Sequence, residues 1–416
     1  MVEKVHPGNR ADRDPVTGIG SGHGETVGIM AILTNTMLGT LWGYLMFPLA
    51  FLFVLTIVVF VHEMGHFLVA RWCGVKVQAF SIGFGKEIWG FNDRHGTRWR
   101  LAMIPLGGYV KFMDDENAAS VPSHEAISNM SPEQRAGSFH AKPLWQRAAV
   151  VAAGPIANFL LAIAIFAVIY SVIGVRLTEA RVDEVIADTP AARVGFKPGD
   201  VIVAIDGSAI SGFNELQRVV GTSPGRKLTF TVKRDGKLMD LSAIPEVREE
   251  PGDVTGMSRR VVIGIKGVRR PQEVGTRSVG PIEAVGLGVS ETKFIITSTL
   301  SYLGDVIAGR QKADQLGGPI RIAEVSGQVA KVGIEALIHL VAVLSVSVGL
   351  INLFPIPLLD GGHLMFYAIE AVRGRSLSER SQEIGFRIGL AVVLSLMVFA
   401  TLNDLPILKR WLSWLG

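Results

Sequence analysis

The sequence contains an H-E-x-x-H motif, His62-Glu63-Met64-Gly65-His66. Residues four apart on a helix share one face, so the imidazoles of His62 and His66 can bind one zinc ion. Glu63 can then take a proton from a zinc-bound water as general base. By chance alone, a chain of this length has a probability of roughly one per cent of containing the motif. The motif therefore predicts a hydrolytic zinc site with His62 and His66 as metal ligands and Glu63 as the catalytic residue.

The motif lies inside an apolar run that continues from Leu41 to Ala70. Ionisable side chains in such a run are unfavourable, usually face the protein interior and mark function by default. The run contains no basic residue that could pair with Glu63. A buried polar helix contact or a proton relay is the alternative to a metal site.

Catalytic zinc sites usually take three protein ligands, and the best third candidate is Asp360. It is the first carboxylate of the third apolar segment, in Asn352-Leu-Phe-Pro-Ile-Pro-Leu-Leu-Asp-Gly-Gly362. His62 lies nine residues before Arg71, and Asp360 lies thirteen before Arg373. At about 1.5 Å per helical residue, the two ligands lie at similar depths, about 13 Å and at most about 20 Å from the same boundary.

Two prolines, Pro355 and Pro357, come shortly before Asp360. They should break the helix, and the freed backbone groups are tolerated at membrane depth only beside protein or a water-filled cavity. A hydrated pocket beside a carboxylate suits hydrolysis at a metal. The alternative is that Asp360 only caps the helix that follows the break.

The composition excludes an ordinary soluble globular protein. Of 416 residues, 49% are hydrophobic and 19% charged, and the mean hydropathy is +0.37, whereas soluble domains carry about 25% charge. The single cysteine, Cys73, excludes an internal disulfide framework. The net charge of +4 and the pI of 9.2 indicate no nucleic-acid partner, because basic residues beside membrane spans account for both.

The apolar runs are long enough, or nearly so, to cross a bilayer as four helices. The predicted segments are a polar N-terminal extension (1–40), transmembrane helices at 41–70, 148–175, 336–372 and 388–403, a cytoplasmic loop (71–147), a soluble β-rich domain (181–246), a linker with an amphipathic segment (247–335) and an interfacial tail (404–416). The first run does not fit a signal peptide, so we expect a retained anchor. The amphipathic stretch 282–332 fits helices on the membrane surface or against the soluble domain.

The distribution of lysine and arginine predicts the orientation. The loop 71–147 holds ten of them, and the loop between the last two spans contains Arg373, Arg375, Arg380 and Arg387. Cytoplasmic loops carry such an excess, so both loops should face the cytoplasm. The soluble domain and both termini should then lie on the outer side.

The outer domain has the pattern of a small β-rich fold. Asp206-Gly207 and Asp235-Gly236 are hairpin-turn signals between short β-branched runs. The stretch 189–207 resembles the PDZ fold of bacterial envelope proteases, which accepts an extended peptide as an added strand. A small β-domain without a ligand is the alternative.

Taken together, the motifs identify a resemblance that covers nearly the whole chain from about residue 40. His62-Glu-x-x-His66 in a first span, Asn352-x-x-Pro-x-Pro-x-Leu-Asp360-Gly in a third and a PDZ-like domain between spans two and three resemble the bacterial site-2 protease family of the RseP type. That resemblance implies an intramembrane zinc metalloprotease of the bacterial inner membrane, with a periplasmic PDZ-like domain and the active site near the cytoplasmic side. The chain departs from the family pattern in one respect. RseP resembles a tandem-PDZ protein, whereas this chain has room for one convincing PDZ domain.

The resemblance also implies roles for individual residues and partners. His62, His66 and Asp360 would bind Zn²⁺, Glu63 would activate the zinc-bound water, and Asn352 would help to hold the substrate backbone. The stretch 77–112, with Gly83, Phe84 and Gly85, would be a membrane-associated β-hairpin region that pairs with an extended substrate, although a plain cytoplasmic hairpin fits the pattern nearly as well. The implied substrate is a single-span membrane protein, an anti-sigma factor already trimmed by another protease, and the PDZ-like domain would bind a peptide or a protein C-terminus.

The predicted fold class is therefore a polytopic α-helical membrane protein of about four transmembrane helices, with a membrane-associated β-hairpin region and one PDZ-like soluble domain. The expected function is hydrolysis of peptide bonds within transmembrane segments, in stress-response signalling. Two alternatives stay open: a membrane-anchored metallopeptidase that cuts cytoplasmic loops, and a non-enzymatic zinc-bearing PDZ scaffold.

Overall fold

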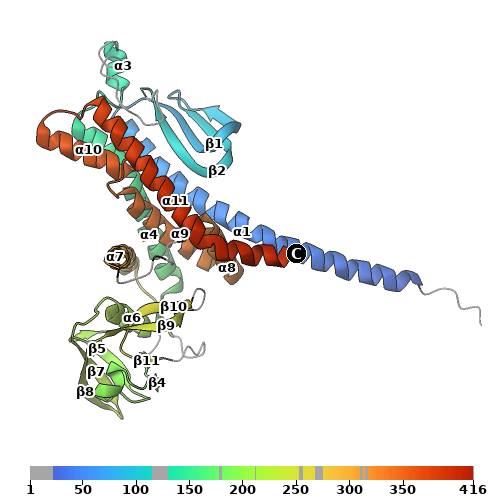
Figure 1. The fold of residues 1–416 in the computed structure, drawn as a ribbon, viewed down its shortest axis with the longest axis vertical. Helices are drawn as coiled ribbons and strands as arrows, with labels where there is room; N and C mark the ends of the chain where they lie inside the picture. The colour runs from blue at the N-terminus through green and yellow to red at the C-terminus, as the bar shows by residue number, and fades with distance from the viewer. Residues whose placement is uncertain are drawn as a thin grey trace, which may run out of the picture.

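The computed structural model describes residues 22–114, 130–177, 180–210, 212–252, 256–267, 275–309, 313 and 317–415. Residues 1–21 of the predicted extension and Gly416 lie outside the described residues. In Figure 1, the long helices form a central bundle, a bent sheet lies at one end, and a β-rich unit lies at the other.

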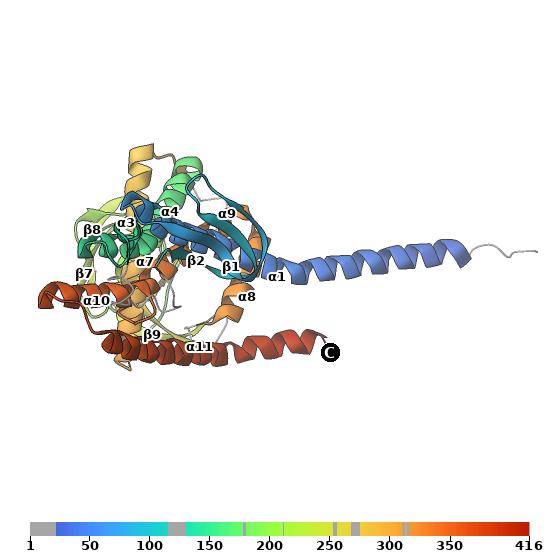
Figure 2. The same ribbon diagram turned by 90° about the horizontal axis from the view of Figure 1, so that it is seen from above.

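Four described helices are long and apolar enough to cross a membrane, as the sequence predicts. The helices are α1 (Gly22–Trp72), α4 (Leu144–Ile173), α9 (Ile334–Asn352) and α11 (Glu379–Leu415). Helix α1 starts at Gly22, well before the predicted span at 41–70, and projects beyond the bundle in Figure 2. Helix α11 likewise continues without a break through the stretch expected to be an interfacial tail.

The third apolar segment is two helices rather than one. Helix α9 ends at Asn352, and α10 (Asp360–Arg373) begins at the proposed third ligand. Pro355 and Pro357 lie in the turn between them. The predicted helix break at these prolines is therefore confirmed.

Helix α4 is the centre of the bundle, in contact with α1, α7, α9 and α10. Its Phe166 is fully enclosed between Val346 of α9 and Ile295 of α7 (Pro281–Ile307). Helix α8 (Pro319–Val332) packs on α1 instead. The predicted amphipathic stretch thus forms two helices that both pack on membrane-spanning helices.

An ion pair fastens α10 to α4. Arg147 lies 2.5 Å from the carboxylate of Glu370, and both side chains are mostly buried. The guanidinium of Arg147 also lies over the ring of Tyr367, 5.0 Å from its centroid. Because α10 begins with Asp360, this contact fixes the helix that carries the third ligand.

The bent sheet consists of β1 (Val77–Asn92) and β2 (Arg98–Phe112). Each strand folds back on itself, so the segment 77–82 pairs with 108–112 on one side and with 98–101 on the other. Gly83 and Gly85 have φ of +89° and +88°, which permits the reversal in β1. The short helix α3 (Pro132–Gly137) follows this sheet.

Aromatic packing and one ion pair attach the sheet to the end of α1. Phe80 is fully buried against Phe67 of α1 and Trp99 of β2. Arg71 at the end of α1 lies 3.0 Å from Asp93 in the hairpin turn. Burial raises the pKa of Asp93, but hydrogen bonds from Trp99 and the turn backbone, with Arg71, outweigh that and lower the pKa.

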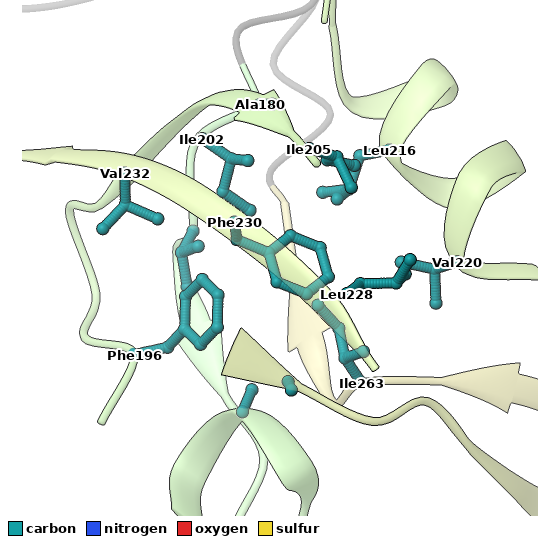
Figure 3. Packing of buried hydrophobic residues seen from close by; sticks show 13 residues of the cluster. Ala180, Phe196, Ile202, Ile205, Leu216, Val220, Leu228, Phe230, Val232 and Ile263 are labelled. Carbon is teal, nitrogen blue, oxygen red and sulfur yellow. The ribbon is translucent and has the colours of Figure 1, made fainter. Parts of the chain in front are cut away.

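The β-rich unit comprises residues 180–210, 212–252 and 256–267. Its elements are β4 (Glu184–Val185), α5 (Pro190–Val194), β5 (Val201–Ile205), β6 (Ser208–Ala209), α6 (Phe213–Gly221), β7 (Leu228–Arg234), β8 (Lys237–Ala243), β9 (Glu246–Gly252), β10 (Gly256–Val262) and β11 (Ile265–Lys266). The order in the main sheet is β6-β5-β7-β8. Figure 3 shows its core, in which Leu228 and Phe230 of β7 pack against Leu216 of α6. Ile263, which closes this core, comes from the stretch expected to be a linker.

The β-rich unit is joined to the bundle at two points. Strand β3 (Val175–Leu177) follows α4 and pairs with β12 (Gly275–Arg277), which precedes α7. In addition, Arg218 of α6 lies 2.7 Å from Glu291 of α7. Both contacts connect the unit to helices that pack around the centre of the bundle.

Breaking the α4–α10 ion pair should destabilise the protein. Removing one partner of a mostly buried pair costs about 3 kcal/mol because the other charge is left unpaired. We expect Glu370→Leu to lower the free energy of unfolding by that amount, measured by denaturant titration in detergent. Arg147→Met together with Glu370→Leu should recover at least half of the loss.

The exposed pair Arg387–Glu383 on α11 provides the matched control. Glu383→Gln should change the free energy of unfolding by less than about 1 kcal/mol. Equal effects at Glu370 and Glu383 would contradict the role of the buried pair.

Candidate metal centre

Three metal-binding side chains converge where α1 meets the start of α10. His62 and His66 come from successive turns of α1, and their Nε2 atoms lie 3.2 Å apart. The Oδ2 atom of Asp360 lies 3.1 Å from Nε2 of His62 and 3.5 Å from Nε2 of His66. The structure therefore brings together the three predicted ligands, which are far apart in the sequence.

These distances fit a tetrahedral zinc ion. Zinc binds nitrogen and oxygen at about 2.0–2.2 Å, which places tetrahedral ligand atoms about 3.3 Å from one another. Oδ2 of Asp360 is buried and has no hydrogen-bond partner, although it is within reach of both imidazoles. Three electron-pair donors close together with an unsatisfied carboxylate oxygen are the arrangement that a cation completes, so the residues present fit zinc.

Helix α4 supports both histidines from behind. Nδ1 of His66 lies 2.9 Å from the backbone oxygen of Val150, and Nδ1 of His62 lies 3.2 Å from the side-chain amide of Asn158. In each ring the Nε2 atom is therefore left to face Asp360. Asn158 was not predicted from the sequence, where the available signal is a polar side chain in an otherwise uncharged span.

Gly154 lets the two helices approach at the site. A Cβ atom at this position would lie 2.3 Å from Nε2 of His66 and 2.9 Å from Cε1 of His62. Such contacts are too short for any side chain. Glycine at 154 therefore makes room for the ligand rings against α4.

The turn between α9 and α10 orients Asp360 toward the two histidines. Leu358 has φ of +103°, an unfavourable conformation for a residue with a Cβ. The turn folds back so closely on α10 that a Cβ at Gly361 would lie 2.3 Å from the backbone oxygen of Leu353. The strain and the close packing hold the first residue of α10 in place.

A cavity of about 150 Å³ opens beside the three ligands, lined by Glu63, His66, Val110, Phe112, Phe139, Val150, Val151, Asp360 and His363. Glu63 thus shares the cavity with two of the metal-binding side chains. The segment 108–112 of β2 forms another wall, because a Cβ at Gly108 would lie 3.0 Å from Cγ of Glu63. The arrangement offers a carboxylate base, a metal centre and a sheet edge at one place.

The four predicted substrate-binding residues lie outside the lining of this cavity. Phe84, between Gly83 and Gly85 at the bend of β1, is 44% exposed and stacks on Tyr109. Asn352 is the last residue of α9 and is partly buried. None of the four lines the 150 Å³ cavity.

A second, larger cavity of about 580 Å³ lies in the β-rich unit. One wall is α6, with Phe213, Leu216 and Gln217, and the other is the stretch 261–267 that contains β11. The groove is mostly apolar and runs beside a short strand.

Filling the space at Gly154 should displace the metal without changing a ligand. We expect Gly154→Ala to lower zinc affinity at least about tenfold, by analogy with the loss of groups that orient ligands. Zinc affinity would be measured by chelator competition on the purified protein.

Gly286→Ala is the matched control, since no heavy atom lies within 4 Å of its Cβ position. It should bind zinc like the unaltered protein. Full zinc affinity in Gly154→Ala would show that the ligand rings do not need this space.

Comparison with known proteins agrees with this centre. The family model of peptidase family M50 matches residues 50–396. The chain is 52% identical to "Putative zinc metalloprotease Atu1380" of Agrobacterium fabrum, with 88% of this chain and 97% of that protein covered. It is 43% identical to metalloprotease MmpA of Caulobacter vibrioides, over 87% and 96% of the two chains, and 31% identical to regulator of sigma-E protease RseP of Salmonella typhimurium, over 88% and 99%.

One solved structure matches only a short segment. The HtrA-type protease AlgW, determined with a decapeptide, is 40% identical over 17% of this chain and 22% of its own, with a TM-score of 0.16. A TM-score this low carries no argument about the fold. The family match and the full-length relatives do carry one: this chain belongs to peptidase family M50 and is a zinc metalloprotease of the site-2 protease type.

Proposed function

We propose that the protein cleaves peptide bonds within the transmembrane segments of single-span membrane proteins. The observation that carries this proposal is the location of the metal centre, because two of its ligands, His62 and His66, belong to a membrane-spanning helix. The third ligand, Asp360, begins the helix that follows another span. A site held between spans reaches substrates inside the bilayer.

The chain's own residues define the chemistry. His62, His66 and Asp360 would hold zinc, which when bound supplies Lewis acidity toward the scissile carbonyl and toward water. Glu63 takes the proton of the attacking water on its carboxylate and then gives it to the leaving amine. The apolar walls, such as Val110 and Val151, restrict bulk water around this transfer.

The substrate docks as an extended strand at the edge of the bent sheet. A helical segment must unwind before attack, because helix hydrogen bonds occupy its backbone. The segment 108–112 pairs only with 77–82 in the described sheet, and the backbone of Val110 is hydrogen-bonded to Glu63, so a substrate strand on the other edge would lie beside this base. Gly83, Phe84 and Gly85 position this sheet against the substrate, and Asn352 holds the substrate backbone from the end of α9.

The protein lies in the bacterial inner membrane, with the β-rich unit in the periplasm and the metal centre near the cytoplasmic side. The bent sheet and the β-rich unit lie at opposite ends of the bundle, which supports this orientation (Figure 1). The basic residues of the loop 71–147 belong to the end that carries the bent sheet.

The β-rich unit acts as a PDZ-like domain that binds a peptide or a protein C-terminus in the groove between α6 and 261–267. The substrate class is an anti-sigma factor that another protease has already shortened. Support comes from the relative at 31% identity, whose name is regulator of sigma-E protease. The groove then selects substrates by their outer portion.

Replacing the base should separate metal binding from catalysis. We expect Glu63→Gln to retain zinc and to lower the rate of substrate cleavage at least about 100-fold, because a glutamine side chain cannot accept the proton. The assay uses purified protein and a single-span substrate in detergent, and mass spectrometry maps the product termini.

Glu383→Gln, an exposed change on α11, should leave the cleavage rate unaltered. A fully active Glu63→Gln variant would overturn the assigned base. Cuts only in exposed loops would favour a membrane-anchored metallopeptidase over an intramembrane protease.

Blocking the groove should weaken peptide binding without affecting the metal centre. Gly221 lines the groove, and its Cβ position has no heavy atom within 4 Å, so the side chain of Gly221→Trp starts in open space at the groove. We expect the affinity for peptides with free apolar C-termini to fall at least about tenfold. This corresponds to a loss of roughly 1.4 kcal/mol in binding free energy. Fluorescence anisotropy on the full-length protein measures this.

Lys237→Trp, an exposed change at the far end of the sheet, is the control. It should bind the same peptides unchanged. Loss of binding in Lys237→Trp but not in Gly221→Trp would place the peptide site elsewhere on the unit.

A further inference from the structure

Asn158 is a fully buried polar residue in the middle of α4. Its side-chain amide lies 3.2 Å from Nδ1 of His62, and its backbone oxygen accepts a hydrogen bond of 2.8 Å from the hydroxyl of Ser345 on α9. Its Oδ1 atom is buried and has no hydrogen-bond partner. One residue thus touches a metal ligand on α1 and the helix that leads to Asp360.

The chemistry of the histidine decides which atom of the amide should face it. Nε2 of His62 points at Nε2 of His66 and Oδ2 of Asp360, so it is the ring nitrogen that offers a lone pair to the metal. In a neutral imidazole the proton is then on Nδ1, which becomes a donor. A donor needs an acceptor, and in the amide of Asn158 only Oδ1 can accept.

A half-turn of the amide satisfies both groups. The oxygen and nitrogen ends of an asparagine amide are nearly the same size, so exchanging them leaves the packing unchanged. After the exchange, Nδ1–H of His62 donates to Oδ1 of Asn158, and the buried unsatisfied oxygen has its partner. The exchange moves Nδ2 of Asn158 to the place that Oδ1 now holds, and it removes an unfavourable contact between two donors, Nδ2–H of Asn158 and Nδ1–H of His62.

The second histidine is held in a comparable way. Nδ1 of His66 faces the backbone oxygen of Val150, which is on the same helix as Asn158. After the exchange, both ligands on α1 have an oxygen of α4 behind them. At His66 the acceptor is main chain and cannot be removed by substitution, whereas at His62 it is a side chain.

We propose that Asn158 is a positioning residue that accepts a hydrogen bond from Nδ1–H of His62 and so fixes the tautomer and ring orientation with which His62 binds zinc. The inference deepens the proposed function, since it depends on His62 being a ligand. The hydroxyl of Ser345 fixes the backbone of Asn158 against α9, so the position of the acceptor is set by three helices.

The test compares zinc binding in variants that keep or lose the acceptor. Asn158→Leu keeps the number and branching of the side-chain heavy atoms but has no acceptor, and Asn158→Asp keeps an oxygen facing His62. We expect Asn158→Leu to lower zinc affinity 10- to 100-fold and Asn158→Asp to stay within about threefold of the unaltered protein or to bind more tightly. Chelator competition on the full-length protein in detergent gives the affinity, and the visible spectrum of the cobalt-loaded protein reports the ligand geometry.

Controls separate this role from packing and from the ligand assignment. Ser345→Ala removes the contact with α9 but not the acceptor and should change zinc affinity less than Asn158→Leu does. If Asn158→Leu does not fold, as judged by thermal denaturation, Asn158→Ala replaces it, because a smaller side chain cannot clash. His62→Ala, measured in parallel, should abolish tight zinc binding.

The outcomes are distinct. Unaltered zinc affinity and an unaltered cobalt spectrum in Asn158→Leu, or an Asn158→Asp variant as weak as Asn158→Leu, would overturn the positioning role of Asn158. Unaltered zinc affinity in His62→Ala would instead overturn the ligand assignment, and with it both proposals.

Discussion

Repulsion among electron pairs governs the centre of this structure. Two imidazole nitrogens and one carboxylate oxygen approach within 3.1 to 3.5 Å of one another in a mostly buried location. Without a cation, such a cluster is unfavourable, because lone pairs face lone pairs and the medium around them is apolar. The packing of the surrounding helices therefore holds the three groups close together. A bound zinc ion makes this arrangement favourable and so stabilises the fold.

Helix α4 contributes no metal ligand, but its residues contact both histidines and hold α10 in place. Gly154 allows the ligand rings to lie against its backbone, and Val150 and Asn158 place a backbone oxygen and a side-chain amide behind them. At the start of the helix, Arg147 holds α10. The residues of α4 that matter to the centre thus include a glycine, a main-chain carbonyl, an amide and a guanidinium. The role of each of these groups can be recognised only from the contacts that α4 makes with other helices.

A feature of the site could be predicted from the sequence where it depends on a local property of the chain, and could not where it depends on contacts between helices. His62 and His66 were predictable because helix periodicity, a local property, places residues four apart on one face. Asp360 was predictable because depth in the membrane is readable from nearby charges, and the helix break was predictable because proline removes a backbone donor. The roles of Gly154 and Asn158 were not predictable, because no local rule indicates which face of α4 meets α1. The extent of the β-rich unit was missed for a related reason. Ile263 lies just before β11, and the partner of β11 is β4, in which Val185 lies 80 residues before its partner Ile265.

The attachment of α10 has a geometric consequence. Asp360 and Glu370 are ten residues apart on one straight helix, so the ion pair and the metal ligand are the two ends of a rigid lever about 15 Å long. If the lever pivots at the Arg147 contact, a tilt of only about 4° moves the carboxylate by about 1 Å, which is half the length of a zinc–oxygen bond. The distance between Asp360 and a bound zinc ion is therefore sensitive to the angle at which α10 packs on α4. The strained turn at Leu358, at the other end, limits how far that lever can swing.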